Sequence, residues 1–484
     1  MAMHYSPWVP ESPAISTAWL YQDFPPFFPW LLALTGAVHS FLSAHVLVTC
    51  MGLASLYFYY FLSKREMNNR DWIILPVLIF ALSPGFLLGL QGILSEPLFL
   101  MLTLVFLLFY KPAEKYTAGY TVIAATILAA ILLTRTIGIA LCTAILMQVF
   151  VSGIAQKNLQ YRPVLIVLLA LLIYFFSMML WGPVKDSHYL DVFIRYLTGK
   201  DLYQIGTGTK HYFSLAIQIN SLLESWTSFW IIYWANEMSA SYYVMMTLLV
   251  LSISGLLIRL YENKLDSWYV LFYLMILLVW PHPGQMVRLL FPIMPLLLLY
   301  SGYAITKLVC QTKFRNRKNM ISSILYMLVL VAVLPSHAFI HTRANMAHES
   351  QMIPVYEIFR IADYEASNRN LVLQNQVLKD LSKIKDIVPE DAKILYFLPS
   401  YLAVLSARKG VAAPSPVDGR TYRQIAKKNG ASYIFLTRFH PRNTRPNFSG
   451  LSGAEHLHSG TEIIWCSQLT DEEPASCLYK ITKP

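Results

Sequence analysis

Residues 116–154, YTAGYTVIAATILAAILLTRTIGIALCTAILMQVFVSGI, decide the fold class. This stretch contains two apolar runs, Tyr116–Thr134 and Ile137–Ile154, and Arg135 between them is its one charged residue. Each run is close to the roughly 20 apolar residues that a helix needs to cross the hydrocarbon core of a bilayer. The stretch therefore predicts two membrane-spanning helices with an arginine at the turn that joins them.

The composition of the whole chain agrees with this prediction. Of its 484 residues, 56% are hydrophobic and only 13% are charged, whereas about 25% are charged in a typical soluble domain. The mean hydropathy is +0.47. These values exclude a disordered chain, a collagen-like chain and a disulfide-stabilised scaffold. They leave a multi-span membrane protein with a soluble part.

Charge-poor runs that reach or nearly reach spanning length recur about ten times, two of them short, and no polar linker divides the first two thirds of the chain. We therefore expect residues 1–340 to form one multi-span membrane domain and residues 341–484 to form a soluble domain. The predicted spans are Phe41–Leu62, Trp72–Leu90, Ile93–Tyr110, Tyr116–Thr134, Ile137–Ile154, Val164–Trp181, Tyr242–Ile258, Trp268–Trp280, Leu289–Thr306 and Ser322–Leu334.

Alternate connections between the predicted spans carry clusters of Lys and Arg. Because cytoplasmic loops are enriched in these residues, we expect the clusters on the cytoplasmic side and the C-terminal domain on the extracytoplasmic side. The same placement accounts for the net charge of +11, so the charge gives no reason to expect nucleic acid as a partner. The clusters are Lys64, Arg65 and Arg70; Lys111 and Lys115; Lys157 and Arg162; Arg259 and Lys264; and Lys313, Arg315, Arg317 and Lys318.

The C-terminal segment is more polar and is expected to form a small α/β domain. Ile394–Phe397 and Tyr433–Leu436 have the pattern of buried strands, and Tyr422–Lys428 that of a helix capped by Gly430. The runs Ile463–Cys466 and Cys477–Ile481 can pair as a hairpin. In an oxidising compartment, the two cysteines of that hairpin can form a disulfide, and otherwise they are small unpaired hydrophobic side chains.

Three ionisable residues interrupt or border the apolar runs, and all three are expected at the outer membrane face. Glu96 precedes Pro97 at a helix start, where Ser95 can serve as the N-cap, so its carboxylate either caps the helix or lies at the mouth of a cavity. Arg135 and Arg288 either extend toward lipid headgroups or bind phosphate, for which the planar guanidinium is well suited. Charges within membrane segments are costly and are usually functional.

The longest outer connection contains further polar candidates. Lys185 and Asp186 lie near its start, where charges most often belong to a solvated loop. Ser214–Trp234 is amphipathic and rich in Trp, which is typical of a segment in the membrane interface. His282 lies between two prolines close to Arg288. We treat Lys185, Asp186 and His282 as candidate substrate-lining residues.

Four short motifs, in their order along residues 23–303, resemble the GT-C superfamily of polytopic glycosyltransferases, in the branch of the protein mannosyltransferases and bacterial aminoarabinose transferases. They are FPPFFPWLLA at 24–33, SEPLF at 95–99, TRTIG at 134–138 and the segment Arg288–Pro295, in which the arginine precedes two prolines.

The resemblance implies an inverting enzyme of a bacterial inner membrane. It implies a polyprenyl-phosphate-linked sugar as the donor, a lipid, glycan or protein as the acceptor, and an active site that faces outward. Arg288 would bind the donor phosphate, Arg135 would support it, and Glu96 would line the acceptor side. The catalytic Asp of the family lies in the first outer loop, in a motif that this chain lacks. Asp23 is the nearest acidic residue, so Asp23 and Glu96 are the catalytic candidates.

Because this chain lacks the motif with the catalytic Asp of the family, two explanations remain. Either the gene start is shortened, or the chain has lost activity and serves in assembly. A third reading is a transporter or flippase of lipid-linked sugars, but inverted repeats and midplane charges, which are frequent in transporters, are not evident. The spacing of His, Cys, Asp and Glu shows no metal-binding motif, and a divalent metal stays an open possibility. The transferase reading requires that Glu96, Arg135 and Arg288 converge on one cavity.

Overall fold

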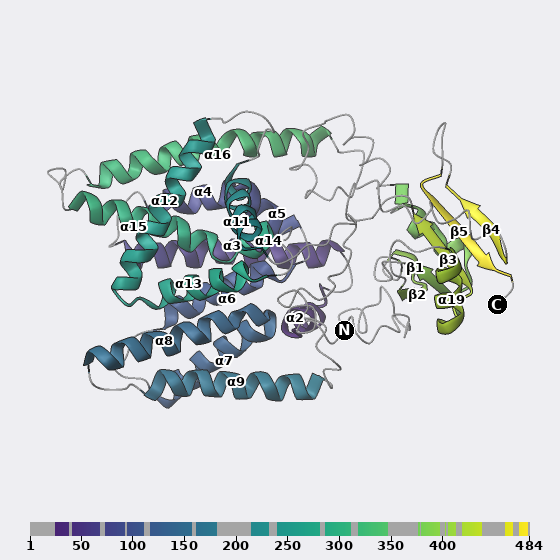
Figure 1. The fold of residues 1–484 in the computed structure, drawn as a ribbon, viewed down its shortest axis with the longest axis horizontal. Coiled ribbons are helices and arrows are strands. Elements are labelled where there is room, and N and C mark those ends of the chain that lie inside the picture. Colours follow the sequence, from purple (N-terminus) through teal and green to yellow (C-terminus); the bar gives the residue numbers. More distant parts are fainter. Residues whose placement is uncertain are drawn as a thin grey trace.

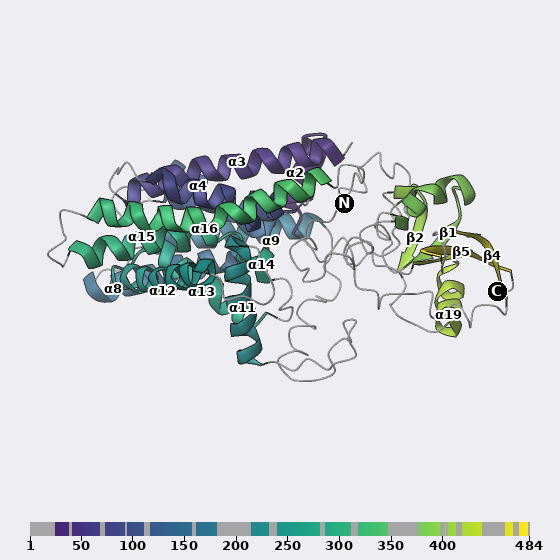
Figure 2. The same cartoon turned by 90° about the horizontal axis from the view of Figure 1, so that it is seen from above.

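The structure is a computed structural model with a bundle of helices followed by an α/β unit (Figures 1 and 2). Most of the long helices lie side by side along the longest axis of the molecule, and α11 runs across them. The structure describes residues 25–37, 41–67, 73–91, 94–110, 117–156, 161–181, 214–231, 240–280, 286–310, 318–346, 376–377, 379–396, 402, 405–412, 419–437, 460–467 and 474–482.

Each of the ten predicted spans falls on one or two helices of the bundle. The helices are α2 (Phe27–Leu34), α3 (Phe41–Glu66), α4 (Ile74–Leu82), α5 (Pro84–Gln91), α6 (Glu96–Phe109), α7 (Ala118–Thr134), the 3-10 helix η3 (Thr136–Gly138), α8 (Ile139–Gln156), α9 (Tyr161–Trp181), α11 (Leu215–Trp230), α12 (Ala240–Tyr261), α13 (Leu265–Leu278), α14 (Met286–Leu290), α15 (Met294–Cys310) and α16 (Lys318–Met346).

Among the described residues, five helical segments are long and apolar enough to cross a membrane. They are Ser43–Glu66, Thr136–Ala155, Tyr161–Leu180, Ala240–Tyr261 and Asn319–Ala338, and shorter apolar helices lie beside them. Their outer faces expose large aliphatic and aromatic side chains, as expected where lipid replaces water. The predicted fold class, a polytopic helical membrane protein with a small C-terminal α/β unit, is confirmed.

Two of the predicted spans are broken, each at a proline. The run Trp72–Leu90 divides into α4 and α5, because Ser83 takes an extended conformation before Pro84. The run Leu289–Thr306 divides into α14 and α15 at Pro292, which has no N–H to continue the helix. Residues of α5, after the first break, and Phe291, at the second break, line a pocket together with Glu96.

Helix α11 is amphipathic, as its sequence predicts, but its Trp residues face the protein. Trp226 and Trp230 are buried, and the indole N–H of Trp226 donates to the backbone carbonyl of Met245 on α12 at 2.9 Å. Leu215 and Ile217 lie on the exposed face. An indole N–H that is buried needs such a partner, so this bond fixes α11 against the bundle.

Close backbone contact joins α12 to α15 at Gly255. A Cβ atom added there would lie 2.0 Å from the carbonyl oxygen of Tyr300, and a backbone atom cannot move aside as a flexible side chain can. Small residues allow membrane helices to approach in this way.

The α/β unit has a five-stranded mixed sheet with strand order β2-β1-β3-β5-β4, where β1, β2 and β3 are parallel and β4–β5 is an antiparallel hairpin. The helical segment 379–387 packs against one face and α19 (Gly419–Asn429) against the other. The strands are β1 (Lys393–Tyr396), β2 (Lys409–Ala412), β3 (Tyr433–Thr437), β4 (Thr461–Cys466) and β5 (Ser476–Ile481). Gly430, with φ +65°, ends α19 as predicted.

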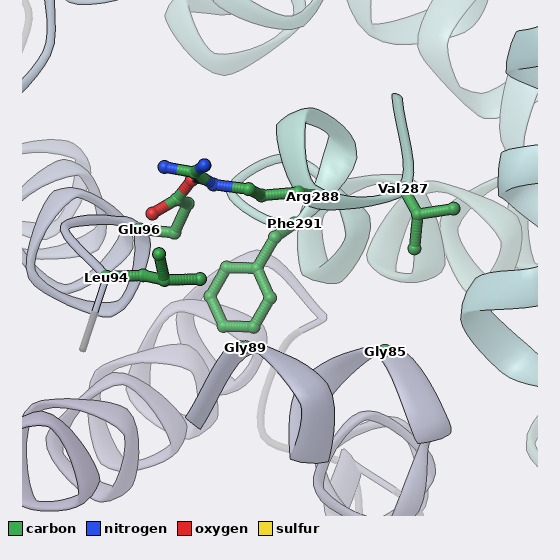
Figure 3. A pocket seen from close by; sticks show the side chains of 7 residues that line it. All are labelled: Gly85, Gly89, Leu94, Glu96, Val287, Arg288 and Phe291. Carbon is green, nitrogen blue, oxygen red and sulfur yellow. Dashed lines mark hydrogen bonds and ion pairs between the residues drawn. The ribbon is translucent and has the colours of Figure 1, made fainter. Parts of the chain in front are cut away.

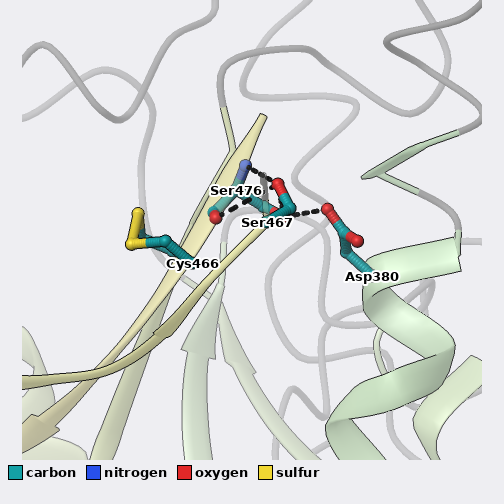
Figure 4. The surroundings of a disulfide bond; sticks show 5 residues. Asp380, Cys466, Ser467 and Ser476 are labelled. Carbon is teal, nitrogen blue, oxygen red and sulfur yellow. Dashed lines mark hydrogen bonds between the residues drawn. A yellow bond between two sulfur atoms is a disulfide. The ribbon is translucent and has the colours of Figure 1, made fainter. Parts of the chain in front are cut away.

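A disulfide and a buried polar cluster hold the hairpin (Figure 4). Cys466 and Cys477 are paired across β4 and β5 by a disulfide. Beside it, the hydroxyl of Ser476 donates to the carboxylate of Asp380, and the amide of Gln376 donates to the other oxygen of that carboxylate at 2.7 Å. Burial, opposed by these hydrogen bonds, holds the pKa of Asp380 above its usual value.

The Gly255 contact predicts that Gly255→Ala destabilises the protein. The added methyl group forces α12 and α15 apart and lowers the free energy of unfolding by about 1–3 kcal/mol. Gly119→Ala on α7 is the matched control, because nothing lies within 4 Å of its Cβ position. Thermal unfolding of the detergent-purified variants measures the effect, and an equal melting temperature for both would show that the two helices are not in backbone contact.

The raised pKa of Asp380 predicts that the α/β unit loses stability as the pH rises. A carboxyl whose pKa is higher in the folded state binds its proton more tightly there, so its contribution is complete below pH 3.8 and is lost as the pH rises through the folded pKa. Hydrogen exchange of the β5 amides, corrected for intrinsic rates, measures the stability of the unit. As the pH rises, this stability should fall in the unaltered protein relative to Asp380→Asn. A difference between the two proteins that is independent of pH would contradict it.

Candidate functional site

Glu96 is the first residue of α6, so the start of that helix sets the position of its backbone. Pro97 occupies the first turn, as expected. The prediction that Ser95 caps the helix is wrong, because its backbone is in the α region and its side chain makes no capping hydrogen bond. Glu96 is the acidic residue of the first turn of α6.

Arg135 is the C-cap residue of α7, and only the three-residue helix η3 separates it from α8. Its extended backbone (φ −153°, ψ 132°) turns the chain, and η3 and α8 follow at once. The backbone N–H of Arg135 still bonds to the carbonyl of Ile131 at 3.0 Å. Its side chain therefore projects from a rigid helix–helix connection.

Arg288 belongs to α14, a five-residue helix that packs against α11 and α5. Phe291, just after α14, stacks on Phe86 of α5 with 6.0 Å between ring centroids and an interplanar angle of 8°. This aromatic contact, together with the break at Pro292, brings α14 into the bundle beside α6.

These three elements bring the three predicted charges together. Oε1 of Glu96 contacts both Nη1 of Arg135 and Nε of Arg288. The side chain of Glu96 is 1% exposed, that of Arg135 is 15% exposed and that of Arg288 is 34% exposed. Both guanidinium groups turn toward the carboxylate rather than along the bundle surface toward headgroups. Arg288 is the member of the cluster that solvent reaches most easily.

A small pocket adjoins Glu96 and Arg288 (Figure 3). The two side chains point toward one another, and the ring of Phe291 lies between them and Gly89. The enclosed space is about 10 Å³, enough for no more than about one water molecule. Its lining is Gly85, Gly89, Leu94, Glu96, Val287, Arg288 and Phe291.

Two glycines on α5 make room for this arrangement, and the sequence analysis did not single them out. A Cβ at Gly89 would lie 2.3 Å from the ring of Phe291, and one at Gly85 would lie 2.2 Å from the ring of Phe229. The spacing of two small residues four apart in an apolar segment is the sequence signal that could have found them. Without this glycine face, Phe291 and hence Arg288 could not approach Glu96.

The charges of the cluster are not balanced. One carboxylate and two guanidinium groups carry a net charge of +1, which one further anion would neutralise. Oε2 of Glu96 is buried and accepts no hydrogen bond from any described residue. A buried acceptor of this kind is costly unless a water or a ligand donates to it. The site is therefore suited to one anionic group and one hydrogen-bond donor.

The remaining site predictions lie outside the described residues. These are Asp23, Lys185, Asp186 and His282. Within the described ranges, no group of three or more His, Cys, Asp or Glu side chains is arranged to hold a metal ion.

A second charged cluster lies on other helices of the bundle, and it is closed. Arg259, which the sequence analysis counted among the loop charges, is 1% exposed and donates to Asp266 at 2.7 Å and to Glu66 at 2.9 Å. The guanidinium carbon also lies 5.0 Å from the centroid of the Tyr303 ring. This cluster joins α3, α12, α13 and α15 and presents its cation to protein groups, in contrast to Arg288.

Comparison with known proteins supports the fold. No protein-family model and no curated protein sequence matches the chain. Among solved structures, ArnT from Cupriavidus metallidurans in the apo state matches 95% of this chain and 88% of its own at 12% identity, with a TM-score of 0.52. The same ArnT bound to undecaprenyl phosphate matches with the same coverage at 13% identity and a TM-score of 0.47.

The archaeal oligosaccharyltransferase AglB from Archaeoglobus fulgidus, in complex with an inhibitory peptide and a dolichol-phosphate, also matches. Its identity is 14% over 85% of this chain, with a TM-score of 0.47. The chain spans about three-fifths of the length of AglB, 61%. ArnT and AglB are both GT-C glycosyltransferases. The match to ArnT in the apo state shows that this chain shares the fold of that protein, at an identity that shows the fold alone.

The ion cluster predicts that Glu96→Gln destabilises the protein. Removing the carboxylate charge leaves two guanidinium groups without their anion, at a cost of up to about 3–5 kcal/mol, reduced to the extent that Arg288 reaches water. The control is Glu262→Gln, whose carboxylate pairs with the more exposed Lys307 and whose loss should cost no more than about 1 kcal/mol. Thermal unfolding compares the two, and a larger loss in the control would contradict the ion cluster.

Proposed function

We propose that the protein is a membrane glycosyltransferase that moves a sugar from a polyprenyl-phosphate carrier to an acceptor on the extracytoplasmic side. The observation that carries this proposal is the meeting of Glu96, Arg135 and Arg288, with a net positive charge, at the ends of membrane helices. A lipid phosphate is an anion at the membrane boundary, which the ends of spanning helices reach. The GT-C fold agrees with the proposal.

Arg288 is the proposed ligand of the donor phosphate. Its guanidinium has several N–H donors, of which Nε is engaged by Glu96, and its side chain is the most exposed of the three. Planar N–H donors can bind two phosphate oxygens at once. Arg135 adds a second positive charge behind Glu96, which favours an anion without being exposed itself.

The same charges suit the chemical step. When an acceptor attacks the anomeric carbon and the bond from the sugar to the phosphate breaks, the lipid phosphate leaves as an anion and needs positive charge rather than an acid. The acceptor group transfers its proton to a base, for which Glu96 and Asp23 are the candidates. In this proposal Glu96 also holds both arginines in place, and its Oε2 accepts a hydrogen bond from a sugar or acceptor group.

The location of the cluster favours this function over the two alternatives. A transporter usually binds its substrate near the bilayer midplane, whereas these charges lie where α6 begins and α7 ends. An assembly protein without a ligand gives no reason to place a buried carboxylate and two arginines together with an excess positive charge. The sugar, the acceptor and the orientation in the membrane are part of the proposal and are open to the same experiment.

The experiment is transfer by membranes that contain the protein, supplied with a panel of radiolabelled undecaprenyl-phosphate monosaccharides. Arg288→Ala should lower kcat/KM about 10- to 100-fold, because hydrogen bonds to a charged group are worth about 1.5–3 kcal/mol. Arg288→Lys keeps the charge but loses the planar donors, so its kcat/KM should lie between those of the unaltered protein and Arg288→Ala.

Arg162→Ala is the matched control, because this arginine lies at the start of α9, away from the cluster, and should leave transfer unchanged. Equal product from the unaltered protein and Arg288→Ala would remove the phosphate role. Absence of transfer from every donor of the panel would overturn the proposed function.

A further inference from the structure

Tyr273 of α13 contacts α14 next to Arg288. Its hydroxyl donates a hydrogen bond to the backbone carbonyl of Leu289 at 2.7 Å, and the side chain is fully buried. The residue also lies within electrostatic range of Glu96, Arg135 and Arg288. The sequence analysis did not single it out, because a tyrosine in an apolar span reads as part of the core.

The helical ladder of α14 leaves the carbonyl of Leu289 without a partner. In a regular α-helix this carbonyl would accept a hydrogen bond from the N–H of Ile293. Here that N–H donates to the carbonyl of Leu290 at 3.0 Å instead. The residue three positions on, Pro292, has no N–H. The Tyr273 hydroxyl therefore satisfies a buried carbonyl that the helix cannot satisfy.

This hydrogen bond acts on the segment that carries Arg288. Helix α14 has only five residues, so its own backbone bonds constrain it weakly. On the side of α5, Phe291 is seated over Gly89. On the side of α13, Tyr273 holds the next residue after Arg288. The two contacts together fix where the guanidinium meets Glu96.

We propose that Tyr273 is a positioning residue, which holds the turn of α14 so that Arg288 contacts Glu96 and presents its free N–H donors to an anionic headgroup. The consequence for donor binding rests on the proposed function, whereas the consequence for Arg288 does not. A hydrogen bond of this kind acts through the backbone, so its loss should displace the arginine without removing any charge.

Tyr273→Phe removes the hydroxyl alone. The ring stays packed against Tyr269, with 5.6 Å between centroids, and against Phe99 at 6.4 Å. Tyr326→Phe is the control, because the hydroxyl of Tyr326 is also buried and donates to a backbone carbonyl, that of Leu298 at 2.7 Å, on the α15–α16 contact. Tyr326 also contacts the hydroxyl of Ser301 at 3.2 Å, so its substitution removes at least as many hydrogen bonds. Only the Tyr273 substitution should affect Arg288, because Tyr326 bonds to α15 and not to α14.

The first measurement is the rate at which phenylglyoxal modifies Arg288 in the full-length protein, followed by mass spectrometry of the peptide. We expect Tyr273→Phe to raise this rate about two- to tenfold, the effect of losing one buried hydrogen bond, and Tyr326→Phe to leave it unchanged. Equal rates in the unaltered protein and Tyr273→Phe, or an equal increase in both variants, would overturn the positioning role.

The second measurement is the dissociation constant for undecaprenyl phosphate in detergent micelles. Tyr273→Phe should weaken binding about two- to tenfold, and Tyr326→Phe should not. Equal weakening in both variants would contradict a specific role of Tyr273 in donor binding. If the unaltered protein does not bind this lipid, the proposed function fails, while the reactivity of Arg288 still decides whether Tyr273 positions it.

Discussion

The contact of one carboxylate oxygen of Glu96 with two guanidinium groups is the interaction on which the architecture of the site depends. A buried carboxylate is stable only with charge partners, and here the partners come from the end of α7 and from α14, where Arg288 lies 192 residues from Glu96 along the chain. Three irregular features serve this contact. They are the break between α4 and α5, the extended turn at Arg135 and the short helix α14.

The two charged clusters of the bundle differ in a way that separates scaffold from site. Arg259 is enclosed by Asp266, Glu66 and two tyrosine rings, so its charge is offset inside the protein. The Glu96 cluster keeps a positive excess, an unsatisfied carboxylate oxygen and a partly exposed arginine. A closed cluster stabilises helix ends, whereas an open one is suited to a ligand.

The sequence predicted what depends on local pattern. Hydropathy located the spans that contain α5, α6, α7 and α14, and four short motifs pointed to the fold, because spans and turn residues leave signals within a few positions. Local signals failed where the partner is distant. Ser95 does not cap α6 with its side chain, because its backbone is in the α region, which its sequence neighbours do not reveal. Tyr273, Gly85 and Gly89 stayed unnoticed, because their roles exist only once α13 and α5 lie against α14.

The central claim is that the Glu96 cluster holds the phosphate of a polyprenyl carrier. The most direct measurement compares the affinity of the unaltered protein for undecaprenyl phosphate and for undecaprenol, which has the same chain without the charge, at low and high salt. The account predicts that the phosphate binds at least about tenfold more tightly, by at least about 1.4 kcal/mol, and that the difference shrinks as salt increases. Equal affinities for the two lipids at every salt concentration would contradict it.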